Sequence, residues 1–221
     1  MRNLIYYLAF LVSIVSCNQS TNSIDIGFGS ISYAQTVTIG TQFWMTKNLD
    51  VSAFRNGDPI PQAKSNKEWQ EAGENKQPVW CYYYNDPGNG AKYGRLFNWY
   101  AVNDSRGLAP KGWHVPSDEE WSKLIAHLGG DAVAGGKMKS TTEWGEPNED
   151  ASNSSGFSGL PGGIRNYDGS FDHIGEFGEW WSSAECNTNN AYHIDMRYIY
   201  GFAPWCWDNK GNGYSVRCLR D

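Results

Sequence analysis

The chain has 221 residues, carries a formal net charge of -6 and is 15% aromatic. Disordered chains are poor in aromatic residues, so this composition excludes a largely unfolded protein. The sequence has no cluster of Lys and Arg, and because proteins neutralise nucleic-acid phosphates with clustered cations, we expect no nucleic-acid partner.

Residues 1–17 have the pattern of an export signal. Arg2 precedes an apolar stretch at 4–15, which is shorter than the roughly 20 residues of a membrane-spanning helix. The stretch ends in IVSC at Cys17, which resembles the lipobox of bacterial lipoproteins. The resemblance implies that Cys17 is lipid-modified and that its acyl chains anchor the protein in a membrane. We expect a cell-envelope lipoprotein of the outer membrane, on its periplasmic or surface side; an ordinary cleaved signal peptide is the alternative.

A polar segment separates this signal from the folded part. Residues 18–32 are rich in Ser, Asn and Gly, a composition typical of a flexible tether. We expect one domain over residues 33–221, because no internal repeat or linker divides it. Its first strands are predicted at Thr36–Ile39 and Phe43–Met45, with a turn at Gly40 between them.

Two helices are predicted from capping boxes, in which a Ser at the N-cap is followed three residues later by a Glu. The predicted helices span Asn66–Ala72 and Asp118–Leu128. The boxes that begin them are Ser65 with Glu68 and Ser117 with Glu120. The second helix also has apolar residues at helical spacing and is followed by Gly129, which favours an end there.

The other predicted elements are short. Between the two helices we predict a strand at 78–84, a turn-rich loop at 85–90 and a helix at 95–102. After the second helix, Gly residues divide the chain into short apolar segments, at 157–160, 171, 180–182, 191–200 and 214–219, the last of them a strand. This mixture of helices and short strands indicates the α+β class.

Several blocks occur in the order of a known family. They are TVTIGTQFWMTKNL (36–49), YGRLFNWYAV (93–102), GWHVPSDEEW (112–121), GGDAVAGGKMK (129–139), SSGFSGLPGGIRNYDGSF (154–171), WWSS (180–183) and SVRCLRD (215–221). They resemble the Fibrobacter succinogenes major paralogous domain, which is similar to the C-type lectin-like fold in the branch of the formylglycine-generating enzyme. The resemblance implies a small twisted antiparallel sheet, flanking helices and long ordered loops. Such domains are common in lipoproteins of Bacteroidota, and their molecular function is undefined.

Apart from Cys17, the chain has Cys81, Cys186, Cys206 and Cys218. An even number in an exported protein indicates two disulfides, for which three connectivities exist. We favour Cys186–Cys206, which flank one predicted strand, and Cys81–Cys218, which lie in blocks typical of the family. Free buried thiols are the alternative.

No pattern predicts catalysis, a metal or a cofactor. Formylglycine-generating enzymes resemble one another in a close cysteine pair that holds copper, and the corresponding stretch at 202–215 carries only Cys206. The strings at 146–148 (EPN) and 207–209 (WDN) resemble calcium-binding motifs of C-type lectins, but their order differs, and we interpret them as polar loops. The His residues lack metal-ligand spacing; they are His114, His127, His173 and His193.

One aromatic stretch remains as a candidate ligand-binding site. It lies outside the strongest family blocks and comprises Tyr198, Tyr200, Phe202, Trp205 and Trp207. Exposed aromatic side chains stack on sugar rings or anchor protein partners. We therefore expect a non-catalytic domain that binds a glycan or an envelope protein. If these side chains pack on the sheet instead, a structural or assembly lipoprotein without a small ligand is favoured; an enzyme of unrecognised type is the third hypothesis.

Overall fold

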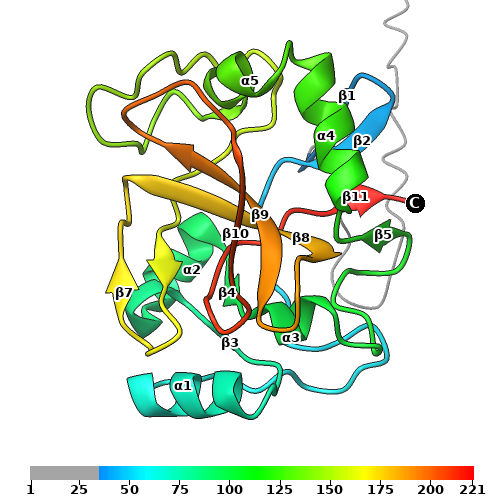
Figure 1. The fold of residues 1–221 in the computed structure, drawn as a ribbon, viewed down its shortest axis with the longest axis vertical. Coiled ribbons are helices and arrows are strands. Elements are labelled where there is room, and N and C mark those ends of the chain that lie inside the picture. Colours follow the sequence, from blue (N-terminus) through cyan, green and yellow to red (C-terminus); the bar gives the residue numbers. More distant parts are fainter. Residues whose placement is uncertain (1–34) are drawn as a thin grey trace, which may run out of the picture.

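The computed structural model describes residues 35–221 (Figure 1). The predicted signal peptide at 1–17, with its lipidated Cys17, and the tether at 18–32 lie outside the described residues. Within the described part, no helix is both long enough and apolar enough to cross a membrane.

The described chain alternates short strands with short helices. The helices are α1 (Asn66–Glu74), α2 (Pro87–Tyr93), α3 (Trp99–Val102), α4 (Asp118–His127) and α5 (Asp131–Met138), with a 3-10 turn at Tyr83–Asn85. The strands are β1 (Thr36–Ile39), β2 (Gln42–Met45), β3 (Trp80–Cys81), β4 (Leu96–Phe97), β5 (Trp113–His114), β6 (Ile164–Arg165), β7 (Phe171–Asp172), β8 (Phe177–Glu185), β9 (Asn190–Arg197), β10 (Trp205–Asn209) and β11 (Leu219–Arg220). This composition confirms a mixed fold of helices and small sheets.

The strands form small antiparallel sheets. One has the order β1-β2-β11-β5 and another the order β10-β9-β8, while β3 pairs with β4 and β6 with β7. Because β11 pairs with β2, the start and the end of the described chain meet in one sheet. Figure 1 shows β8, β9 and β10 crossing the centre of the domain, with α4 and α5 toward one end and α1 at the other.

The core consists of three clusters of buried side chains, each named here after one Trp. The Trp181 cluster includes Phe97, the Trp180 cluster includes Trp121 of α4, and the Trp69 cluster lies next to α1. Successive residues of a strand face opposite sides of a sheet. Trp180 and Trp181 are neighbours on β8 and both are fully buried, so β8 joins the two larger clusters.

The elements that begin with clear local signals agree with the predictions. In α4 the Ser117 side chain accepts a hydrogen bond from the Glu120 amide, and the Glu120 carboxylate accepts one from the Ser117 amide. The same capping box begins α1 at Ser65 and Glu68. The first two strands are confirmed, with β2 beginning one residue earlier than predicted, at Gln42.

Two helices, α2 and α5, lie in Gly-containing stretches for which we predict no helix. The predicted loop at 85–90 is wrong, because the Asp86 side chain accepts a hydrogen bond from the Gly88 amide and Pro87 occupies the first helical turn of α2. In α5, two Gly residues lie inside the helix because the chain packs closely there. A Cβ atom on Gly135 would lie 2.0 Å from the Phe202 carbonyl oxygen.

Three predicted segments are only partly regular. The strand predicted at 78–84 is reduced to β3, since Tyr84 takes a left-handed conformation with φ 52°. The helix predicted at 95–102 is a strand, β4, followed by α3, because the Asn98 side chain caps α3 in mid-segment. In the final segment predicted at 214–219, only the last residue belongs to β11; the earlier part forms isolated bridges.

Candidate functional site

The predicted aromatic stretch lies on and before β10, which is an edge strand beside β9. In the antiparallel register Trp207 is opposite Tyr192, and Trp205 is opposite Ile194. Directly opposed residues share a face of the sheet. Trp205, Trp207 and Tyr192 therefore form one surface, which we call the aromatic face.

The members of the aromatic face differ in exposure. Trp207 is 61% exposed, so its indole is open to a ligand. Trp205 is half-buried, packs against the Trp180 cluster, and meets Tyr192 edge to face with 6.1 Å between ring centroids. The packing of Trp205 fixes the strand, and the exposed ring of Trp207 is the part that remains available for binding.

The other predicted aromatic residues belong to the connection between β9 and β10. Tyr198 is half-buried and packs against the Trp180 cluster. Tyr200 donates a hydrogen bond to Asp195 at 3.3 Å, and its ring stacks on Phe202 at 5.2 Å. The prediction of one continuous binding stretch is therefore corrected: Tyr198 and Tyr200 pack or bond internally, while Phe202 is exposed apart from the aromatic face.

A buried Lys holds this connection in place. The Lys139 ammonium donates hydrogen bonds to the carbonyl oxygens of Glu149, Arg197 and Tyr200 at 2.7, 2.9 and 2.9 Å. Burial lowers the pKa of Lys139 to about 8. Because three backbone carbonyls converge on one cation, the segment before β10 is fixed in shape, and so is the strand that carries Trp207.

The opposite face of the same sheet carries a buried polar cluster, which sequence reasoning missed. Glu179 of β8 is directly opposite Asp195 of β9, and the Glu179 carboxylate lies 3.3 Å from His193 Nδ1. All three residues are at most 5% exposed. Burial and then the charge of Asp195 raise the pKa of Glu179 to about 8, and burial lowers the pKa of His193 to about 4. At neutral pH the cluster therefore holds a carboxylic acid and a neutral imidazole.

The groups around this cluster form hydrogen bonds with one another. The Tyr214 hydroxyl donates to Asp208 at 2.9 Å and accepts from Asn212 at 3.0 Å. Burial, followed by the charges of Asp195 and other neighbours, raises the pKa of the Cys206 thiol to about 11. Because the thiolate is the reactive form of cysteine, Cys206 is held in its unreactive form.

The structure forms neither of the predicted disulfides, because the described cysteines are free. Cys186 lies beside the Tyr192 hydroxyl, on the side of the aromatic face. Cys206 is opposite His193 and so belongs to the other face of the sheet. Cys81 lies in the Trp69 cluster and Cys218 in the Trp181 cluster. Both predicted pairings, Cys186–Cys206 and Cys81–Cys218, are thus corrected.

The two strings that resemble lectin calcium motifs lie far apart. Asp208 is opposite Ala191 near the start of β9, whereas the Glu149 amide, next to the string at 146–148, donates to Tyr198 just after the end of β9. At about 3.3 Å per residue, Ala191 and Tyr198 lie roughly 23 Å apart along the strand, so the two strings do not share one site. Among residues 35–221, no three His, Cys, Asp or Glu side chains are grouped to hold a metal ion.

The cavities on the described surface include two that are lined in part by polar side chains. One, of about 400 Å³, is lined by Asn48, Asp50 and Lys92 among others. Three of its polar side chains already have partners: Asn48 donates to the Tyr93 carbonyl at 2.8 Å, Asp50 pairs with Arg95 at 2.9 Å, and Lys92 pairs with Glu143. These three side chains therefore serve the fold.

The second cavity, of about 210 Å³, lies where α1, the residue Tyr100 of α3 and the end of β10 meet. Two Tyr rings and several amide side chains line it, including Tyr167, Asn189 and Asn209. Asn209 follows Trp207 by two residues on β10, on the same face of the strand. Sequence analysis did not find this cavity, because its walls come from segments far apart in the chain.

Comparison with known proteins identifies the family. The model of the Fibrobacter succinogenes major domain matches residues 37–220, which include every described strand and helix of the fold apart from the first residue of β1. No curated protein and no solved structure matches the chain. The chain therefore belongs to the Fibrobacter succinogenes major domain family.

Proposed function

We propose that this protein is a lipid-anchored lipoprotein of the outer membrane whose domain binds glycans at the aromatic face without catalysing a reaction. The observation that carries the proposal is the 61% exposure of Trp207 on an edge strand. Burying an indole face against a sugar ring removes apolar surface from water, while Asn209, two residues farther along the same face of β10, offers polar atoms for sugar hydroxyls.

The finer fold assignment is part of the proposal. A C-type lectin-like fold is supported by the small antiparallel sheets, by the flanking helices and by the ordered loops between α5 and β6. The Cys206 thiol beside the polar cluster has a raised pKa, so this thiol is not an activated nucleophile.

The membrane anchor rests on the sequence at Cys17. Metabolic labelling of cells with a radioactive fatty acid should label the wild-type protein, and the Cys17→Ser variant should lose the label. Equal labelling of the two proteins would contradict the anchor. Fractionation of the same cells would show whether the labelled protein is in the outer membrane.

The binding proposal can be tested with a glycan array probed by residues 33–221. We expect binding that the Trp207→Ala variant loses by at least about tenfold, because one desolvated aromatic anchor contributes roughly 1–3 kcal/mol. Tyr84→Ala is the matched control, since Tyr84 is 64% exposed and lies outside the aromatic face. Equal binding by wild type and Trp207→Ala would contradict the role of Trp207.

A protein partner is the second candidate, favoured by the open edge of β10. An edge strand presents unpaired backbone groups to which an extended peptide can add. If the wild-type domain binds no glycan on the array, a protein partner or a structural role is favoured over a glycan. Cross-linking at Trp207 in intact cells would separate these two, because a structural role predicts no specific adduct there.

A further inference from the structure

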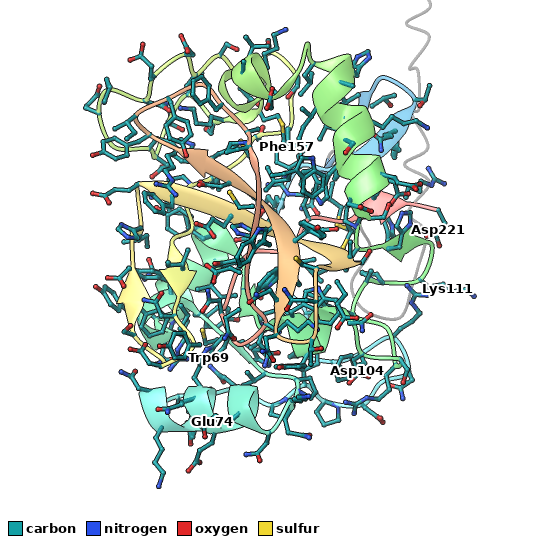
Figure 2. The ribbon with its side chains drawn as sticks, in the orientation of Figure 1. Trp69, Glu74, Asp104, Lys111, Phe157 and Asp221 are labelled. Carbon is teal, nitrogen blue, oxygen red and sulfur yellow. The ribbon has the colours of Figure 1, made fainter. Side chains whose placement is uncertain are left out.

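The smaller cavity has rigid walls. Trp69 of α1 is fully buried, and its indole nitrogen donates to the Gly211 carbonyl at 2.8 Å, which fixes α1 against the turn after β10 (Figure 2). Next to the wall residues Asn189 and Asn209, the buried Lys210 donates from its ammonium to the Thr188 carbonyl at 3.0 Å and from its amide to the Asn189 carbonyl at 2.9 Å. The cavity is therefore formed before any ligand binds, which lowers the entropic cost of binding.

The polar groups that face this cavity are largely unused by the fold. Among the described residues, the hydroxyls of Tyr100 and Tyr167 and the side-chain amide of Asn189 form no hydrogen bond. Asn209 accepts one bond, from the Gly211 amide at 2.8 Å, which leaves its NH₂ group free to donate. Burial raises the pKa of Tyr100, so this half-buried hydroxyl stays protonated and can both donate and accept.

The remaining wall residues narrow the class of ligand. Glu74 and Lys76 contribute one negative and one positive charge at the rim, so the cavity as a whole is neutral. Figure 2 shows Glu74 on α1, at the outer end of the domain. The volume of about 210 Å³ is below the roughly 300–1,000 Å³ typical of pockets for drug-sized ligands. A neutral ligand of one ring, with several hydroxyls and an apolar face, satisfies these conditions.

We infer that this cavity binds one ring of a neutral oligosaccharide whose chain continues over Trp207. The inference rests on the proposed glycan-binding function and adds a defined subsite to it. Asn209 lines the cavity and lies on the same face of β10 as Trp207, about 7 Å away along the strand. The Tyr167 ring, 59% exposed, covers the apolar face of the sugar, while Tyr100, Asn189 and Asn209 bond its hydroxyls.

The experiment is a calorimetric titration of residues 33–221 with neutral gluco-, manno- and galacto-oligosaccharides of one to four rings. The variants are Tyr167→Ala, Tyr100→Phe and Asn189→Ala, with Tyr84→Ala as the control at an exposed Tyr outside the cavity. We expect Tyr167→Ala to raise Kd about tenfold and the two polar variants to raise it roughly threefold each. Tyr100→Phe removes a single oxygen and keeps the ring, so it tests the hydroxyl without disturbing α3.

Each outcome decides the inference. Weaker binding by both Trp207→Ala and Tyr167→Ala, with a loss that disappears when the oligosaccharide is shortened by one ring, supports the subsite. Weaker binding by Trp207→Ala alone overturns the subsite and leaves the proposed function standing. Weaker binding by Tyr167→Ala alone supports the cavity and contradicts the role of Trp207. No binding of any oligosaccharide to the wild-type domain overturns both.

Discussion

The largely buried strand β8 and the edge strand β10 of the same sheet carry similar residue types in different environments. The aromatic face ends at Trp207, which is 61% exposed, whereas Trp181 on the other face is fully buried beside the polar cluster. Acids on one face differ as well, because Asp208 on β10 is exposed while Glu179 on β8, on the same face, is 5% exposed. Which of these side chains can meet a ligand is thus decided by what covers each end of the sheet, and residue type alone does not reveal it.

This difference in environment is tested most directly by replacing one Trp on each face with Ala. Trp181→Ala should lower the free energy of unfolding by about 3–5 kcal/mol, since it removes a buried indole that contacts Tyr214 at 4.4 Å between centroids and donates to the Phe97 carbonyl. Trp207→Ala should change it by less than about 0.5 kcal/mol. Urea unfolding followed by circular dichroism measures both, and equal losses would mean that Trp207 is a core residue.

The polar cluster predicts a pH dependence of stability. The pKa of Glu179 is about 8 in the folded protein against 4.5 for an unperturbed Glu. Between these values the folded state binds a proton that the unfolded state releases, so stability falls as pH rises from 4.5 through 8. Glu179→Gln keeps the shape and cannot ionise, so we expect it to be more stable than wild type by roughly 1–3 kcal/mol at pH 9 and about equal at pH 5.

This prediction is checked by urea unfolding at pH 5, 7 and 9. Glu119→Gln is the matched control, because Glu119 lies exposed on α4. Parallel pH profiles for wild type and Glu179→Gln would contradict a buried, protonated Glu179. His193 adds an acid limb to both profiles, since its pKa of about 4 means that stability is lost as pH falls from about 6.5 through 4.

Local signals explain what the sequence could predict. The capping boxes at Ser65 and Ser117 depend on neighbouring residues, and both helices begin where predicted. The alternation of Trp205 and Trp207 around Cys206 could likewise identify a strand with one aromatic face. Such signals lie within one turn of a helix or one strand and need no knowledge of distant contacts.

The parts that could not be predicted depend on segments far apart in the chain. Glu179 meets Asp195 only through the register of β8 with β9, although His193, Asp195 and Arg197 at every second position of β9 were a signal of a polar face. The cavity needs α1, α3 and β10 together. Trp207 is exposed because the buried core beneath α4 does not reach the end of β10. No local sequence pattern could predict where this core ends.

The smallest expected effect tests the cysteines on the two faces. Because Cys186 and Cys206 are free and face opposite sides of the sheet, Cys186→Ser should change the free energy of unfolding by less than about 0.5 kcal/mol. A disulfide between them would make the same change cost about 2–5 kcal/mol. Urea unfolding of wild type and variant, each with and without dithiothreitol, distinguishes the two. If dithiothreitol destabilises the wild type to the level of Cys186→Ser, the Cys186–Cys206 disulfide exists. The two cysteines would then have to lie on the same side of the sheet.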